Sequence, residues 1–294
     1  MHKSGFVNII GNPNVGKSTL MNALVGEKLS IITSKAQTTR HRIMGIVNGE
    51  DFQIVYSDTP GILKPAYKLQ ESMMNFVRGA VSDADVILYV TDTVEEQGER
   101  SAQILEKIAH SGIPTIVIIN KIDLTTQEKL EALVAQWHER MPAATIIPAS
   151  AKEGFNMEGI FAQILGHLPE GEPFYPKDAL TDKTLRFFAS EIIREKILLN
   201  YDKEIPYCCE IEIDSYKEEA AIDRISATIY VTRDSQKGIV IGHKGEMLKK
   251  VGMQARQDLE KFLGKRVFLQ LFVKVGGDWR NSERQLRRFG YEQE

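Results

Sequence analysis

Cysteine is nearly absent from this chain of 294 residues, which has only Cys208 and Cys209. Two cysteines cannot form a disulfide framework, and neighbours in sequence rarely bond to each other. We therefore expect a protein of a reducing compartment. Cysteine and histidine also show none of the spacings typical of a structural zinc site, which argues against zinc-stabilised domains.

Long hydrophobic runs are also missing. No apolar stretch approaches the length that spans a bilayer, and the run after Met1-His2-Lys3-Ser4 is too short for a signal peptide. The chain is 43% apolar and 26% charged, a composition typical of soluble globular proteins. We expect a cytoplasmic protein whose length suits one large or two ordinary domains.

Charge is unevenly distributed along the chain. Residues 1–180 hold 16 Lys and Arg against 21 Asp and Glu, whereas residues 233–290 hold 14 against 6. A basic region confined to the end of an acidic chain indicates a surface that faces a polyanion. Solvated helix faces are the alternative explanation for the same charges.

Residues 11–19 fit the phosphate-binding pattern G-x-x-x-x-G-K-[ST], between an apolar run at 5–10 and a helical pattern at 20–25. The glycines allow backbone amides to surround a polyphosphate at the positive end of the helix. Lys17 is expected to reach the β- and γ-phosphates, and Ser18 to bind magnesium. Thr19 fits better as a helix residue than as a ligand. The full candidate loop is Gly11, Asn12, Pro13, Asn14, Val15, Gly16, Lys17, Ser18 and Thr19.

Two further segments fit a nucleotide-dependent switch. The polar stretch at 34–40 contains two threonines, of which we favour Thr39 over Thr38 as the residue that closes over the γ-phosphate and completes the magnesium shell. The second segment, after the buried strand expected at 52–56, is Asp58, Thr59, Pro60 and Gly61. Asp58 can hold magnesium through water, and Gly61 can offer its amide to the γ-phosphate.

Two later motifs indicate recognition of guanine. The strand expected at 115–119 leads into Asn120, Lys121 and Asp123, where the carboxylate can accept hydrogen bonds from both N1 and N2 of guanine. Asn120 is expected at the far edge of the purine and Lys121 over its ring. Ser150, Ala151 and Lys152 follow the strand expected at 145–148. The backbone amide of Ala151 can donate to guanine O6. These elements follow strand ends, where open α/β sheets bind ligands.

With these motifs in order, the first 170 residues resemble the translation-factor type of GTPase domain, and the whole chain is similar to the Era family of bacterial GTPases. The resemblance implies a P-loop α/β domain with a mixed, mostly parallel sheet, and hydrolysis of GTP to GDP with magnesium. It also implies a catalytic role for Lys17, Thr39 and Gly61, and a potassium ion held partly by Asn14. The alternative role for Asn14 is to stabilise the loop through a local hydrogen bond. Signalling GTPases place a water-orienting glutamine where this chain has Ile62.

The second half begins after a proline-rich stretch. Pro169, Pro173 and Pro176 predict a semi-rigid linker over 169–180, which divides a domain at 1–168 from another at 181–294. A helix is expected over 185–199. Its expected core face consists of Leu185, Phe188, Ile192, Ile193 and residues 196–199. Strands at 207–213 and 221–232 should form an antiparallel pair.

Gly242 and Gly245 are separated by two polar residues, between an apolar turn and a helical pattern, and this stretch resembles the G-x-x-G loop of a smaller α+β KH domain of the bacterial, type II order. Such glycines let a single-stranded backbone come close, and a lysine can meet its phosphate. A plain helix-helix turn is the alternative. The candidate RNA-binding residues are Lys237, Ile239, Val240, Ile241, Gly242, His243, Lys244 and Gly245.

The basic tail around Trp279 to Phe289 fits two roles equally well, an extension of the RNA surface or a cap that buries Trp279. The family resemblance implies a factor for small ribosomal subunit assembly that binds GTP or GDP and the 3′ region of small-subunit ribosomal RNA. It also implies a monomer with loose, peripheral contact with the inner membrane. The alternatives are a signalling GTPase whose C-terminal domain binds protein, and an ATP-using phosphotransferase built on the same loop.

Overall fold

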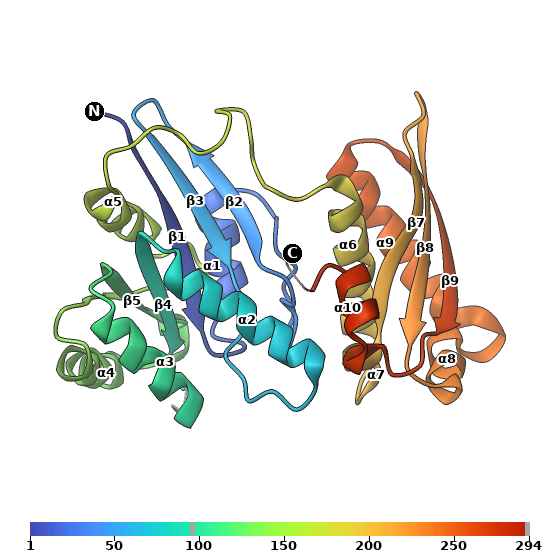
Figure 1. Ribbon diagram of the computed structural model, residues 1–294, viewed down its shortest axis with the longest axis horizontal. Coiled ribbons are helices and arrows are strands. Elements are labelled where there is room, and N and C mark those ends of the chain that lie inside the picture. The colour runs from blue at the N-terminus through green and yellow to red at the C-terminus, as the bar shows by residue number, and fades with distance from the viewer. Residues whose placement is uncertain (95–97, 292–294) are drawn as a thin grey trace. The chain divides into compact units, whose positions relative to one another are not determined.

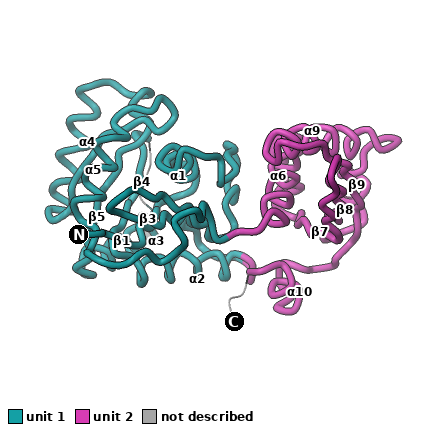
Figure 2. The backbone as a smooth tube through the Cα atoms, turned by 90° about the horizontal axis from the view of Figure 1, so that it is seen from above, with its two compact units in different colours: residues 1–66, 70–182 teal, residues 67–69, 183–294 magenta. Residues whose placement is uncertain are grey.

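The structure is a computed structural model that describes residues 1–94 and 98–291, apart from the side chains of Glu99 and Arg100. Two compact units make up the chain (Figure 2). The first comprises residues 1–66 and 70–182, and the second comprises residues 67–69 and 183–294.

The first unit is built on a six-stranded sheet in the order β2-β3-β1-β4-β5-β6. Only β2 runs antiparallel to its neighbour, so the sheet is mixed and mostly parallel, as predicted. The apolar runs that indicated strands form the buried middle of the sheet. The strands are β1 (Lys3–Gly11), β2 (Ile43–Asn48), β3 (Phe52–Asp58), β4 (Val86–Asp92), β5 (Thr115–Asn120) and β6 (Thr145–Pro148).

Helices cover both faces of this sheet (Figure 1). Those over one face, α2 (Lys68–Ser82), α3 (Glu99–His110) and α4 (Gln127–Arg140), enclose an apolar core with β1, β4 and β5. The remaining two, α1 (Lys17–Val25) and α5 (Met157–His167), contact each other on the opposite face. A short turn of helix, η1 (Ile122–Leu124), follows β5. The carboxyl ends of β1, β3, β4 and β5 therefore meet at one edge, where ligands bind in folds of this kind.

Residues 169–182, here called the strap, are hydrogen-bonded along the sheet of the first unit. Gln53 exchanges two hydrogen bonds with the backbone of Tyr175, at 2.8 and 2.9 Å. Further on, the Ile46 amide donates to the Leu180 carbonyl at 2.8 Å, beside an antiparallel bridge between Gly45 and Thr181. The strap thus covers the outer edge of β2.

The second unit has a three-stranded sheet in the order β7-β8-β9, in which the first pair is antiparallel, as predicted, and the second is parallel. Its core lies between the sheet and four of the helices described below, and apolar side chains from each of these elements contribute to it. The elements are α6 (Leu185–Asn200), α7 (Ile205–Cys208), β7 (Glu210–Lys217), β8 (Ile222–Val231), α8 (Asp234–Ile241), η2 (His243–Gly245), α9 (Glu246–Leu263), β9 (Arg266–Val275), η3 (Trp279–Asn281) and α10 (Glu283–Arg288). This order of elements confirms the predicted α+β KH domain.

Two local predictions were wrong. Tyr207 and Cys208 belong to α7 instead of a strand, because Pro206 at the start of that helix favours a first helical turn. Leu185 and Leu199 are 43% and 57% exposed, so they do not lie on the core face of α6. The other expected core positions of that helix include Phe188, Ile193, Ile197 and Leu198, which are buried as predicted.

Trp279 takes the second of its two predicted roles. Its side chain is fully buried, its indole Nε1 donates to the Cys208 carbonyl at 3.0 Å, and its ring meets Phe289 edge-on at 5.6 Å. Both cysteines are free and buried. In the described ranges 1–94 and 98–291, no helix combines the length and apolar character needed to cross a bilayer.

Gln53→Ala tests how firmly the strap is held. The substitution removes both bonds to Tyr175 from a fully buried side chain, so we expect stability to fall by about 1–3 kcal/mol. Amide hydrogen exchange should accelerate at Tyr175 and Ile46, measured by mass spectrometry. Gln127→Ala, which removes an exposed glutamine, is the control; equal exchange in the two variants would contradict the contact.

Candidate functional site

The predicted phosphate loop connects β1 to α1, and two of its glycines are required by close neighbours. A Cβ on Gly11 would lie 2.1 Å from the Val90 carbonyl oxygen. Gly16 has φ +96°, and a Cβ there would lie 2.2 Å from Asn120 Nδ2. Only glycine fits both places, so the loop can keep its amides directed inward at the start of α1.

The Lys17 ammonium lies within the curve of the loop. Its side chain is buried, and Nζ donates to the carbonyl oxygens of Gly11 at 3.1 Å and Asn12 at 2.8 Å. Gly61 lies against the same loop, since a Cβ there would be 2.7 Å from Cα of Pro13. Thr19 is part of α1, as expected.

Three oxygen-bearing side chains meet beside Lys17. The Ser18 hydroxyl donates to Asp58 Oδ2 at 2.7 Å, the Thr39 hydroxyl reaches the same oxygen at 3.2 Å, and the two hydroxyls are 2.9 Å apart. The structure therefore brings together the three residues proposed from the sequence as magnesium ligands.

Asp58 is fully buried at the end of β3, and its second oxygen, Oδ1, has no hydrogen-bond partner in the described structure. Burial raises the pKa of the Asp58 carboxyl, and the nearby Lys17 ammonium opposes that rise. A buried acceptor with unused capacity beside two hydroxyls is a hard oxygen site, which fits Mg²⁺ completed by phosphate and water. The described residues contain no cluster of three Asp, Glu, His or Cys side chains that could hold a metal by themselves.

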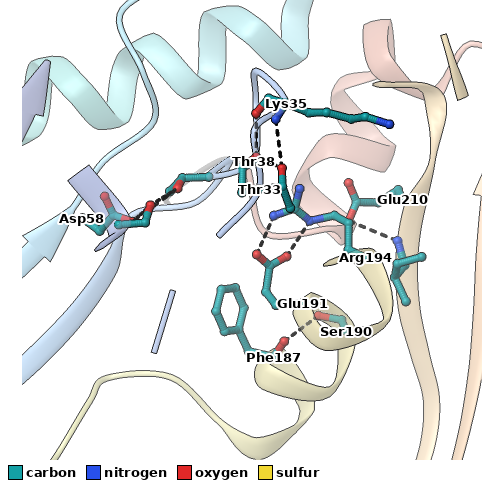
Figure 3. A network of polar contacts seen from close by, with 12 residues as sticks. Thr33, Lys35, Thr38, Asp58, Phe187, Ser190, Glu191, Arg194 and Glu210 are labelled. Atoms are coloured by element: carbon teal, nitrogen blue, oxygen red, sulfur yellow. Dashed lines mark hydrogen bonds and ion pairs between the residues drawn. The ribbon is translucent and has the colours of Figure 1, made fainter. Parts of the chain in front are cut away.

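The structure distinguishes the two candidate switch threonines. Thr39 is buried and faces Ser18 and Asp58, whereas the Thr38 hydroxyl donates to the Lys35 carbonyl and pairs with Thr33, both at 2.6 Å (Figure 3). The segment around them and the phosphate loop line a cavity of about 350 Å³. Thr39 is therefore the threonine placed at the candidate metal site.

The guanine motifs converge, but with partners that the sequence did not predict. Asn120 donates from Nδ2 to the Val15 carbonyl at 2.8 Å, and its Oδ1 accepts from the Ala151 amide at 3.0 Å. Asn120 thus braces the phosphate loop against residues 150–152, instead of bonding only to the purine edge. The Ala151 amide, expected at guanine O6, is engaged by that brace.

Asp123 and Lys121, the residues expected to recognise the base, each have a polar partner. The Ser150 hydroxyl donates to one oxygen of the exposed Asp123 carboxylate at 2.6 Å. Lys121 is held beside the loop by hydrogen bonds from Nζ to the Asn14 carbonyl at 2.5 Å and to Asp92 at 2.7 Å. Lys152 is exposed and pairs with Glu153 at 3.1 Å.

Two side chains bear on hydrolysis. Ile62 is buried in the core with Met74 and Val77, so no polar group stands at the position after Gly61. Asn14 has φ +66° and an exposed side chain. No hydrogen bond from the Asn14 side chain is found in the described structure, so the local bond considered as its alternative role is not seen.

Sequence reasoning missed the contacts that hold the backbone just before residues 34–40, here called the switch segment. The Asn22 side chain in α1 accepts from the amides of Leu29 and Ser30 and donates to the Ser30 carbonyl. The buried Ser30 hydroxyl in turn lowers the pKa of Asp58 against the effect of burial. An asparagine inside a helix was the only sequence signal, because such residues favour side-chain bonds to nearby backbone.

The G-x-x-G loop lies between α8 and α9. Gly242 has φ +75°, and a Cβ there would lie 2.7 Å from Cβ of Met247, while Gly245 has φ +81° and open space around it. His243 and Lys244 between them are exposed. The loop therefore presents two polar side chains between glycines whose positive φ angles favour glycine.

The apolar residues of α8 divide into two groups. Ile239 is 49% exposed and Ile241 is half-buried, so both can line a groove. The Val240 side chain is fully buried in the core, and its carbonyl accepts from the Tyr201 hydroxyl at 2.6 Å. The prediction that Val240 contacts bases was wrong, because one face of an amphipathic helix must pack inward.

Family models match both halves of the chain. Residues 6–121 match the family described as 50S ribosome-binding GTPase, and residues 204–280 match the KH domain. Curated relatives match at full length. GTPase Era of Syntrophus aciditrophicus is 46% identical over 293 residues, covering 99% of this chain and 96% of the relative, and GTPase Era of Alkaliphilus metalliredigens is 46% identical with 99% of both covered.

Two solved structures extend the comparison. A structure of Era in complex with MgGDPNP and nucleotides 1506–1542 of 16S ribosomal RNA is 40% identical, with a TM-score of 0.95 and 100% of both chains covered. A tyrosine-to-alanine variant of Aquifex aeolicus Era bound to GDP and AlF4⁻ is 41% identical, with a TM-score of 0.94, covering 99% of this chain and 100% of the other. A P-loop domain with the guanine motifs, a KH domain and full-length similarity agree: the chain belongs to the Era family of GTPases.

Proposed function

We propose that this protein is a GTP-hydrolysing switch whose KH domain binds the 3′ region of small-subunit ribosomal RNA and assists assembly of the small ribosomal subunit. The observation that carries the nucleotide part is the convergence of Ser18, Thr39 and Asp58 beside Lys17. Era, which is 40% identical over the whole chain, has been solved with MgGDPNP and 16S ribosomal RNA.

The chain's residues take distinct parts in hydrolysis. Lys17 and the amides of residues 11–18 bind the phosphates, and Ser18, Thr39 and Asp58 hold the metal directly or through water. When bound, Mg²⁺ neutralises the charge that develops on the phosphate oxygens. Gly61 lies against the loop, where a Cβ would meet Pro13, so its backbone amide can come close to the γ-phosphate. Because Ile62 is buried, water must be oriented by groups other than that side chain.

Potassium is the proposed source of additional positive charge. The exposed Asn14 side chain lies in the loop that surrounds the phosphates, and an amide oxygen is a suitable ligand for such an ion. A cation here would partly replace the missing glutamine, since it would stabilise charge in the transition state instead of orienting water.

The RNA part rests on the G-x-x-G loop and its surroundings. Lys244 and His243 are exposed between two glycines with positive φ, and Ile239 offers half of its surface beside them. A single strand can place its phosphates on this loop and its bases over the neighbouring apolar surface. The basic balance of residues 233–290 supports a polyanionic partner.

Other parts of the proposal rest on family membership. We place the GTPase domain at 1–168, the connection at 169–180 and the KH domain at 181–294. We also propose a cytoplasmic monomer that binds the small ribosomal subunit and contacts the inner membrane peripherally. The rival proposal, a signalling GTPase whose C-terminal domain binds protein, is favoured by no observation in the described residues.

Asp123→Asn tests base recognition. The amide would replace one acceptor by a donor, so we expect affinity for GTP to fall by roughly 5- to 150-fold, as an unpaired polar group costs about 1–3 kcal/mol. Affinity for xanthosine triphosphate should rise, because its C2 carbonyl can accept from the new amide. Calorimetry measures both, with Glu128→Gln on the exposed surface of α4 as control. If Asp123→Asn leaves the choice between nucleotides unaltered, Asp123 does not recognise the base, which would favour the ATP-using phosphotransferase.

Potassium dependence is tested by hydrolysis rates in potassium and sodium buffers of equal ionic strength. We expect hydrolysis to be faster in potassium, and Asn14→Ala to remove the difference while leaving GDP binding intact, because the ion stabilises charge that develops during the reaction. Equal rates for the unmodified protein in both buffers would refute the potassium proposal.

Gly245→Asp tests the RNA loop. The site has open space around it, so the new carboxylate should repel phosphate without a steric clash, and we expect affinity for a single-stranded RNA to fall at least tenfold in filter binding. Gly264→Asp is the matched control, since Gly264 ends the same helix, α9, with φ +63° and equally open space. Equal RNA affinity in both variants would favour the protein-binding alternative.

A further inference from the structure

A polar cluster has the buried side chain of Arg42 at its centre and includes Ser57, the residue before Asp58. Arg42 directly precedes β2 and is 8% exposed. Its Nε donates to Ser57 Oγ at 2.6 Å, Nη1 donates to Asp83 Oδ2 at 2.5 Å, and Nη2 donates to Asp83 Oδ1 at 3.0 Å and to Asn8 Oδ1 at 3.1 Å. All three nitrogens of the guanidinium are therefore engaged.

The cluster joins four parts of the first unit. Asn8 lies on β1, Ser57 on β3, and Asp83 directly after α2. Asn8 Nδ2 also donates at 2.7 Å to both the Ala80 carbonyl and Asp83 Oδ1. Arg42 thus fastens the start of β2 to the neighbouring strands and to the end of α2.

These contacts matter because Arg42 lies only three residues after Thr39. Ser57 and Asp58 are adjacent on β3, and side chains of adjacent strand residues point to opposite faces. Thr39 bonds to Asp58, and Arg42, three residues later, bonds to Ser57. Since three residues span at most about 10 Å, Arg42 limits how far Thr39 can move from the metal site.

Stability alone does not explain such a cluster. Arg42 is buried but its ion-pair partner Asp83 is half exposed, so water screens the pair and its contribution to stability is small; the geometry that the hydrogen bonds impose explains the cluster better. Arginine suits this purpose because its planar fork holds several acceptors at fixed angles, which a lysine cannot do. Because the Asp83 side chain is 50% exposed, Asp83→Asn is a mild way to weaken its ion pair with Arg42.

We propose that Arg42 is a positioning residue for GTP hydrolysis, which anchors the C-terminal end of the switch segment to Ser57, Asn8 and Asp83 and thereby holds Thr39 at the metal site. The proposal rests on the proposed function, because it assigns Thr39 to the γ-phosphate and Mg²⁺. Arg42 itself touches neither, so it acts through Thr39.

The test measures affinity for Mg²⁺ with GDPNP, affinity for Mg²⁺ with GDP, and the hydrolysis rate, using the full chain. In Arg42→Gln we expect GDPNP affinity and hydrolysis to fall roughly tenfold, while GDP affinity stays within about twofold, since Thr39 contributes only when a γ-phosphate is present. Asp83→Asn, the milder variant, should shift the same quantities in the same direction and less far.

Two comparisons separate positioning from a general loss of structure. Asp85→Asn changes a carboxylate two residues from Asp83 whose partner is the Phe6 amide, so it should leave the ratio of GDPNP to GDP affinity unchanged. In a Thr39→Ala background, Arg42→Gln should have no further effect on that ratio, because residues that act through each other are not additive.

Equal losses of GDP and GDPNP affinity in both Arg42→Gln and Asp83→Asn would overturn the proposal, as would additivity with Thr39→Ala. These results leave the proposed function standing if the unmodified protein hydrolyses GTP and Thr39→Ala impairs it. A Thr39→Ala variant with full activity would instead contradict the proposed function itself.

Discussion

The buried carboxylate of Asp58 is the contact on which the first unit depends. It ends β3, accepts from Ser18 at the start of α1 and from Thr39 in the switch segment, and has one oxygen without a partner. A charge so deeply buried is costly unless it is matched by a cation and hydrogen bonds. Asp58 therefore brings together the end of β3, the start of α1 and the switch segment, which are distant in sequence. They meet at the candidate metal site, beside the phosphate loop.

Much of this arrangement could be predicted from the sequence, because its motifs impose backbone constraints. Gly11 and Gly16 have neighbours that exclude any side chain, so their spacing alone identified the loop. The apolar runs of the central sheet fixed its strands, and the position of each motif after a strand fixed the edge where they meet. In the second unit, the glycines and the order of elements identified the KH domain in the same way.

Contacts between side chains from separate elements could not be predicted. Asn120 bonds to Val15 and Ala151, and Arg42 bonds to residues on β1, on β3 and after α2, and no local pattern reveals these partners. The face that a short helix turns toward the core could not be predicted either. Val240 is buried while Ile239 beside it is half exposed, because the rotation of α8 is set by packing against Tyr201 and the rest of the core. Tyr207 and Cys208, expected at the start of a strand, belong to α7 because Pro206 favours a first helical turn.

The strap gives the strand after the switch segment a neighbour from its own chain. An uncovered outer strand offers a row of amides and carbonyls to which foreign polypeptides can add by β-augmentation. Here Leu180 and Thr181 occupy that row on Ile46 and Gly45. Another polypeptide therefore cannot add as a strand at this edge of β2 while the strap is in place. A rearrangement of β2 would also displace Leu180 and Thr181, which directly precede the second unit.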